Sequence, residues 1–477
     1  MVFSAPTFLF LFLPGVLLAY LLGPRALRAP LLLAASLGFY IWGEQAVVAV
    51  LVASSLAGWL GTAWILRLPD PRARRRRVAL VSALVLAPLV WFKYAGWLVD
   101  EAARLTGGQA WMPAPEIALP IGISFFTFQI LSYVFDAARD VVPRERRFDR
   151  FLLYVSLFPQ LVAGPIVRYR DVLADLADRR VRWLDVEQGL GRFCIGLIKK
   201  VLIADALARP ADELFAFDPG HLGAGAAWYG LVCYSLQIYF DFSGYSDMAI
   251  GLGRVFGFRF PENFRHPYTA RSVTEFWRRW HISLSSWFRD YVYIPLGGNR
   301  RGPARTAVHL WAVFLLCGVW HGAAWNFVLW GAWHGLALVV ERRLGLGADG
   351  PWRARHLLSL AVTLWVVMVG WVLFRAPDLA HAAAYLERLF VPGPGDPVTV
   401  PASHFYTPVQ LPALALALLC VAPLWRTALA ALEGRVHSAA PACLLHAARV
   451  SLLGLLVGCA ILQTAAASYS PFIYFRF

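Results

Sequence analysis

The stretch from Thr306 to Glu341 decides the fold class, and it reads TAVHLWAVFLLCGVWHGAAWNFVLWGAWHGLALVVE. Between its two ends it contains no Asp, Glu, Lys or Arg. A membrane-spanning helix needs about 20 mostly apolar residues, so the stretch is long enough for two short crossings with a turn near His321. We therefore predict a helical hairpin inside a membrane.

Apolar runs of similar length recur along the rest of the chain. The expected spans are residues 3–22, 29–43, 46–66, 78–99, 117–136, 226–250, 357–374, 410–428 and 446–467. Charged residues make up only 15% of the sequence, whereas a soluble domain carries about 25%. We predict an all-α polytopic membrane protein with about 11–12 transmembrane helices plus re-entrant and interfacial helices. Residues 1–477 are expected to form one domain, with N-terminal helices (1–99), a motif-bearing core (117–341) and C-terminal helices (357–477).

The net charge of +15 comes from short basic clusters between the apolar runs, such as Pro69–Arg77 and Arg144–Arg150. Clusters of this kind are typical of cytoplasmic loops, and the intervening loops carry Glu44 or the pair Asp100 and Glu101. The alternation predicts an N-terminus outside the cytoplasm and argues against a nucleic-acid partner. The cysteines stand singly without a CxxC pair, so we predict neither a disulfide framework nor a metal site.

Three segments do not resemble simple spans. Residues 151–167 are apolar, but prolines and a glycine interrupt them and basic loops flank them on both sides, so we expect a re-entrant element. Residues 188–208 contain Lys199 and Lys200, and either cross the membrane or lie in its interface with the lysines snorkelling. Residues 253–305 combine ten arginines with many aromatic residues, which predicts short helices at the cytoplasmic face.

The first candidate for chemistry is His321. It lies midway between Arg305 and Glu341, far from the cytoplasmic surface, where an ionisable group is costly and therefore a functional candidate. Histidine titrates near neutral pH and can accept the proton of a hydroxyl group. Glycines around it allow close helix packing, and four tryptophans are expected to wall it: Trp320, Trp325, Trp330 and Trp333. The structural alternative is a buried imidazole bonded to a backbone carbonyl.

Two further clusters are candidates. In Glu275–Asp290, a continuous helix would place Trp277, His281 and Leu284 on one face and leave Arg278 and Arg279 to meet phosphates. The alternative is a basic amphipathic helix on anionic headgroups. In the apolar span Tyr239–Asp247, Asp241 and Asp247 either orient His or Arg groups or satisfy a structural polar network.

Several motifs in a fixed order resemble the membrane-bound O-acyltransferase family. The resemblance is greatest to its bacterial branch, typified by the membrane subunit of alginate O-acetylation, and more distant to the D-alanyl transferase of teichoic-acid modification. The motifs are residues 158–169, 237–247, 261–268, 276–281, 289–300, 320–322 and 471–477.

The resemblance implies a catalytic His321 and a second functional histidine, His281, around a central tunnel. It implies a cytoplasmic thioester donor, acetyl-CoA, with no bound cofactor and no metal. His321 would act as general base on an acceptor hydroxyl, or itself carry an acyl group. The candidates for the tunnel and acyl site are Trp320, Asn326, Trp277 and Asp241, with Asn326 as an oxyanion donor. The candidates for binding the donor phosphates are Arg278, Arg279 and Arg289.

The expected setting is a bacterial cytoplasmic (inner) membrane, with membrane lipid, a separate periplasmic acetyltransferase and polysaccharide machinery as partners. The acceptor stays open among alginate, cellulose, peptidoglycan, another glycan or a partner's serine. Three alternatives stand beside acetyl transfer: transfer of D-alanyl or another acyl group from a carrier protein, a transporter or export channel, and a non-catalytic scaffold. The sequence has no internal repeat of the kind that many transporters carry.

Overall fold

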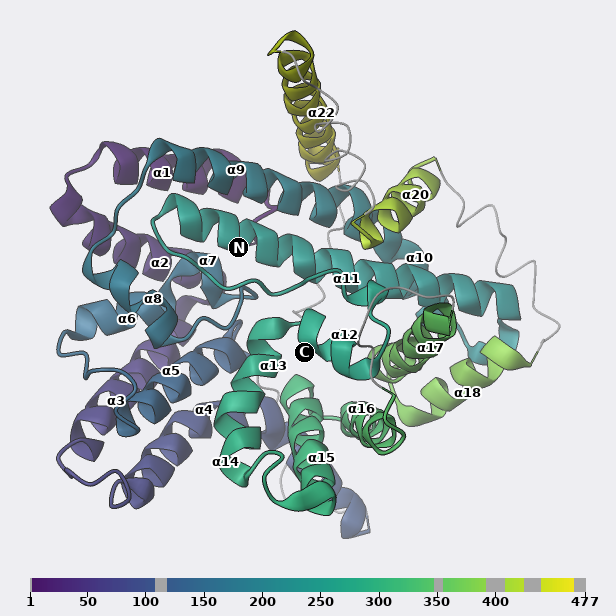
Figure 1. Ribbon diagram of the computed structural model, residues 1–477, viewed down its shortest axis with the longest axis horizontal. Coiled ribbons are helices and arrows are strands. Elements are labelled where there is room, and N and C mark those ends of the chain that lie inside the picture. The colour runs from purple at the N-terminus through teal and green to yellow at the C-terminus, as the bar shows by residue number, and fades with distance from the viewer. Residues whose placement is uncertain (1, 108–117, 347–354, 392–407, 424–438, 467–477) are drawn as a thin grey trace. The chain divides into compact units, whose positions relative to one another are not determined.

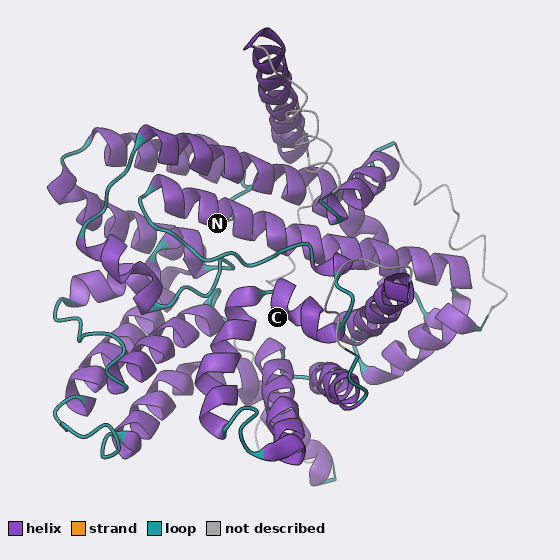
Figure 2. Cartoon of the chain, viewed as in Figure 1, coloured by secondary structure: helices purple, strands orange, loops and turns teal. Residues whose placement is uncertain are grey.

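The computed structural model describes residues 2–107, 118–346, 355–391, 408–423 and 439–466. Within these ranges every regular element is a helix and no strand occurs, which confirms the all-α prediction (Figures 1 and 2). The chain forms two compact units, Met1–Phe193 with Ser246–Glu262, and Cys194–Tyr245 with Asn263–Phe477. The helices α9 (Trp183–Ile198) and α11 (Ala224–Val255) each contribute residues to both units.

The first unit is built mainly from the N-terminal helices. Their bounds are α1 (Leu13–Leu22), α2 (Arg28–Glu44), α3 (Val48–Ile65), α4 (Arg75–Leu105), α5 (Ile123–Ala138), α6 (Phe148–Ser156), α7 (Phe158–Leu161) and α8 (Tyr169–Ala177). The side chains of α5 are almost all buried, because α3 and α4 pack against it.

The segment expected to be re-entrant is helical but broken. The chain leaves helical geometry at Leu157, between α6 and α7, and Pro159 lies in the first turn of α7. The residues of both short helices beyond the first turn of α6 are buried, and the backbone N–H of Phe158 donates to Ser36 Oγ at 3.1 Å. Protein therefore encloses this irregular backbone, which is a condition that a re-entrant element must meet. The re-entrant position itself stays a prediction.

Within the described residues, five stretches are helical, long and apolar enough to cross a membrane: Arg25–Ile65, Arg75–Leu105, Gly302–His321, His356–Arg375 and Cys443–Ala466. The first contains two of the expected spans, and Phe8–Leu22, Ile123–Ala138 and Gln410–Val421 are shorter apolar helices. The end of the expected span 410–428, residue 467 and the tail 471–477 lie outside the described residues. The chain is thus a polytopic membrane protein, and the count of about 11–12 crossings stays a prediction.

The second unit carries the remaining helices. Their bounds are α10 (Ala206–Ala216), α12 (Val273–Arg279), α13 (Ile282–Phe288), α14 (Ile294–Leu296), α15 (Gly302–His321), α16 (Trp325–Arg343), α17 (Arg355–Arg375), α18 (Leu379–Phe390), α20 (Gln410–Val421) and α22 (Ala439–Ala466). Residues Lys199–Asp205 form a π-helical turn before α10. For Lys200, the snorkelling alternative is wrong: its ammonium is buried and lies 2.6 Å from Asp205 and 2.9 Å from Asp241. The two carboxylates compensate the buried charge.

The charged block, residues 253–305, folds into short helices, as predicted, but its central stretch is not one helix. α12 ends at Arg279, and His281 adopts φ +43° before α13 begins at Ile282. A left-handed residue breaks an α-helix, so the prediction that Trp277, His281 and Leu284 share one helical face is wrong. The turn instead sends His281 into the interior, where it is 1% exposed.

The hairpin predicted from Thr306 to Glu341 is present, with α15 ending at His321 and α16 beginning at Trp325 (Figure 1). The two helices touch through glycines. A Cβ added at Gly318 would lie 2.3 Å from the carbonyl oxygen of Phe327, and one at Gly331 would lie 2.3 Å from that of Phe314. Only glycine allows backbones this close.

Candidate active site

His321 is the last residue of α15 and lies in a cage of aromatic rings. It is 7% exposed, and its ring centroid lies 4.7 Å from that of Trp320, 5.0 Å from Trp330 and 5.1 Å from Phe374. Two of the four tryptophans predicted to wall it do so. The other two do not, because Trp325 is exposed and the indole N–H of Trp333 donates to the carbonyl of Val366.

His281 approaches the same cage from the α12–α13 turn. Its ring centroid lies 6.4 Å from that of Trp320 and 4.6 Å from that of Phe242. Its Nδ1 lies 3.1 Å from Asn263 Oδ1. The structure therefore places both His281 and His321 next to the indole of Trp320, although 40 residues separate the two histidines in sequence.

A third histidine, His334 of α16, extends the cluster. It is fully buried, with ring centroids 5.0 Å from Trp277 and 5.2 Å from Trp330. Neither ring nitrogen of His334 has a hydrogen-bond partner among the described residues. The available signal was a second Trp-His-Gly motif, Trp333 to Gly335, but nothing in the sequence assigned His334 a role.

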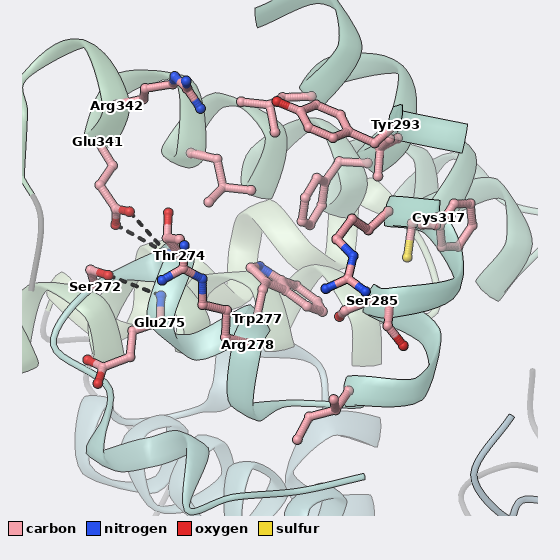
Figure 3. Close-up of a pocket in the computed structure, with 18 of the residues that line it drawn as sticks. Ser272, Thr274, Glu275, Trp277, Arg278, Ser285, Tyr293, Cys317, Glu341 and Arg342 are labelled. Atoms are coloured by element: carbon pink, nitrogen blue, oxygen red, sulfur yellow. Dashed lines mark hydrogen bonds between the residues drawn. The ribbon is translucent and has the colours of Figure 1, made fainter. Parts of the chain in front are cut away.

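A cavity of about 920 Å³ lies beside this cluster. Figure 3 shows residues that line it. Its polar part is lined by Arg271, Arg278, Arg289 and Arg342, and its apolar part includes Trp277 and Cys317. The volume lies within the range of small-molecule and cofactor sites, about 300–1,000 Å³. Arg271 and Arg342 were missed from sequence, since their place depends on how α12 packs against α16.

The arginine side chains at the cavity differ in whether they form hydrogen bonds or ion pairs with other protein groups. Within the described residues, Arg278 and Arg342 make no hydrogen bond or ion pair, so their guanidinium groups are available to a ligand. Arg289 lines the cavity but bonds Asp290 at 2.6 Å. The Glu341 carboxylate accepts the backbone N–H of Thr274 at 3.1 Å, at the first turn of α12 (Figure 3). Arg279, a predicted phosphate ligand, is not part of the lining and bonds Glu275 and Thr269.

Two residues of the cavity lining connect it to the histidines. Cys317 lines it and lies four residues before His321, which places both on one face of α15. Trp277 lines it and contacts His334. The arginine-lined cavity and the histidine cluster are therefore adjacent parts of one unit.

The remaining candidates lie in structural networks. Asp241 pairs with Lys200, and Asp247, in the first unit, pairs with Arg192 at 2.8 Å. Asn326 is buried on the first turn of α16, and its Nδ2 donates to the carbonyl of Ala376 at 2.9 Å. Nothing in these contacts brings Asp241 or Asn326 to the cavity wall.

Comparison with known proteins agrees with the geometry. The family model of the membrane-bound O-acyltransferases matches residues 121–375, which include the cavity and all three histidines. The chain belongs to the membrane-bound O-acyltransferase family. The resemblance inferred from the motifs is thus confirmed, and the chain is a membrane-bound O-acyltransferase.

Relatives within the family carry several names. The chain is 42% identical to a "probable alginate O-acetylase" (AlgI) of Pseudomonas putida over the whole length of both proteins. It is 33% identical to the peptidoglycan O-acetyltransferase of Helicobacter pylori, covering 82% of this chain and 80% of that one. It is 28% identical to the teichoic acid D-alanyltransferase of Bacillus subtilis, covering 55% of this chain and 70% of the relative.

Proposed function

We propose that this O-acyltransferase takes an acetyl group from cytoplasmic acetyl-CoA and passes it across a bacterial inner membrane to a hydroxyl group of a cell-surface polysaccharide. The transfer is either direct or through a separate periplasmic transferase. The observation that carries the proposal is the adjacency of the arginine-lined cavity to His321, through Cys317 one helical turn away.

The donor end of the site is the group of cavity arginines. Arg278 and Arg342 project positive charge without a protein counter-ion among the described residues, and guanidinium groups bind phosphates by charge-assisted hydrogen bonds. Coenzyme A carries several phosphate groups and a long, narrow thiol arm. With its phosphates at these arginines, the arm follows the apolar wall toward Cys317. The positive-inside rule puts this charged block on the cytoplasmic side.

The transfer step needs a base and a dry site. His321 accepts the proton of the acceptor hydroxyl as the hydroxyl oxygen attacks the thioester carbonyl. The carbon–sulfur bond then breaks, coenzyme A leaves as a thiolate, and the proton passes to it from the imidazolium. The rings of Trp320, Trp330 and Phe374 keep water away from the thioester, which would otherwise be hydrolysed.

The acceptor is proposed from the relatives. Those that align with this chain over its full length are named for alginate O-acetylation, and the D-alanyltransferase aligns over a smaller share at lower identity. An acidic exopolysaccharide such as alginate is therefore the first acceptor to test.

The test uses purified protein in sealed vesicles with acetyl-labelled acetyl-CoA and alginate oligosaccharide on the other side. We expect free coenzyme A on the donor side and labelled acetyl ester on the acceptor side. His321→Ala should abolish both products, whereas His221→Ala, at an exposed histidine before α11, should retain them. Intact acetyl-CoA appearing on the acceptor side would instead identify a transporter.

A further inference from the structure

Asn263 is the centre of a buried hydrogen-bond cluster next to His281. It belongs to the motif Pro261–Tyr268, to which the sequence assigned no chemistry, and its side chain is fully buried. Three groups lie within hydrogen-bond distance of its Oδ1: Nδ1 of His281 at 3.1 Å, the backbone N–H of Ser283 at 3.2 Å and the hydroxyl of Ser283 at 2.9 Å. One amide oxygen thus accepts three hydrogen bonds from His281 and Ser283.

The orientation of the Asn263 amide follows from one of these contacts. A backbone N–H can only donate, so the atom that faces Ser283 N must be the amide oxygen and not its nitrogen. The same oxygen faces His281 Nδ1, and an oxygen of this kind only accepts. The hydrogen bond therefore requires a proton on Nδ1.

A proton on Nδ1 determines the state of the second ring nitrogen, Nε2. In a neutral imidazole the second nitrogen, Nε2, then carries the lone pair. Nε2 of His281 is buried and has no hydrogen-bond partner among the described residues. Among the residues that the structure describes, no Asp, Glu, Lys or Arg forms a hydrogen bond or ion pair with His281. The ring therefore has no counter-ion there to favour its charged form.

The backbone of Asn263 holds the same turn. Its carbonyl oxygen accepts the N–H of Ile282 at 3.0 Å, directly after His281. His281 has φ +43°, a conformation that a non-glycine residue keeps only when its surroundings impose it. Asn263 therefore fixes both the main chain and the ring of His281.

We propose that Asn263 is a positioning residue that holds His281 in the Nδ1–H tautomer and presents the lone pair of Nε2 to the acyl-transfer site as a proton acceptor. The proposal rests on the function proposed above, because it assigns His281 to that site. Trp320, which contacts His281 and His321, connects this acceptor to the catalytic cage.

The first test reads the tautomer without any activity. In the full-length protein labelled with ¹⁵N-histidine, the difference spectrum between the native protein and His281→Gln isolates the two ring nitrogens of His281. We expect a protonated Nδ1 and an unprotonated Nε2. A protonated Nε2, or an Asn263→Leu spectrum with an unchanged His281 signal, would overturn the proposal.

The second test separates positioning from folding. Asn263→Leu removes the acceptor, and we expect kcat for acetyl transfer to fall by about 10- to 100-fold with little change in KM. Asn263→Asp keeps all three hydrogen bonds and adds a charge that favours the imidazolium form. It should therefore restore activity at alkaline pH and move the acid limb of the pH–rate profile upward by about 1–3 pH units. A structural role alone would not move that limb.

The matched control is Gln129→Leu in α5, because Gln129 is also fully buried and its amide has no partner among the described residues. Its activity and pH profile should match the native protein. Equal activity in Asn263→Leu and Gln129→Leu, or a native pH profile in Asn263→Asp, would refute the proposal. If the native protein shows the expected tautomer but transfers no acetyl group, the proposed function fails and the tautomer assignment stands.

Discussion

The contact between α15 and α16 allows a sharp prediction at Gly318. In Gly318→Ala the new methyl carbon would lie 2.3 Å from the carbonyl oxygen of Phe327, whereas carbon and oxygen in close contact stay about 3.3 Å apart. The helix backbones fix the positions of both atoms, so no side-chain rotation relieves the overlap. The two helices would have to separate locally by about 1 Å.

Two opposing effects determine how much Gly318→Ala changes the free energy of unfolding. Alanine favours a helix over glycine by about 1 kcal/mol, and forcing an extra methyl group into a packed contact costs about 1–3 kcal/mol. Gly335→Ala provides the control, because its methyl group would meet Phe314 Cβ at 3.4 Å, an ordinary contact. Both variants share the propensity gain, so their difference isolates the clash at about 1–3 kcal/mol.

Activity should respond more than stability. His321 follows Gly318 by three residues on α15, and a displacement of about 1 Å in a catalytic group can cost about 100-fold in rate. The assay compares the thermal unfolding midpoint in detergent and the acetyl-transfer rate in vesicles for the two variants. Gly318→Ala should lose most of its activity at a modestly lowered midpoint. If Gly318→Ala and Gly335→Ala behave alike in both measurements, the close-packing argument is wrong.

Other predictions concern charge. Arg278→Gln and Arg342→Gln should each raise KM for acetyl-CoA by about 10- to 100-fold with kcat nearly unchanged, and steady-state kinetics at low salt measures this. Lys200→Met should lower stability by about 3–5 kcal/mol, since it strands two buried carboxylates, and adding Asp241→Asn should recover part of the loss in thermal unfolding. The Arg182 side chain holds the pKa of Asp185, at the start of α9, down to about 2. Its folded-state pKa is depressed, so the stabilisation is present at neutral pH and fades as pH falls from about 4 toward 2. Asp185→Asn should therefore destabilise the protein at pH 7 and not at pH 2, as unfolding at the two pH values would report.

The hairpin and the charged block show what the sequence could predict. Hydropathy located α15 and α16, because a span without charge has few other structures open to it. The position of His321 at the turn followed from the same pattern. Both the fold class and the catalytic candidate therefore came from local information.

The parts that could not be predicted depend on contacts between distant residues. The residues next to His281 in sequence do not predict its left-handed backbone conformation, because the residue that stabilises this conformation is Asn263, 18 residues earlier. The sequence left the segment around Lys200 open between a crossing and an interfacial position, because the buried partner of Lys200, Asp241 on α11, lies 41 residues away. Arg342 resembled any basic loop residue, and only the packing of α12 against α16 places it in the cavity.

The central claim is that the arginine-lined cavity delivers an acyl donor to His321. The most direct measurement compares donor binding and acetyl transfer in the native protein and in His321→Ala, using acetyl-CoA and alginate oligosaccharide. We expect His321→Ala to bind acetyl-CoA within about twofold of the native affinity, because the arginines are untouched, and to lose at least about 100-fold in transfer rate. A His321→Ala protein that transfers acetyl groups at the native rate would contradict the account.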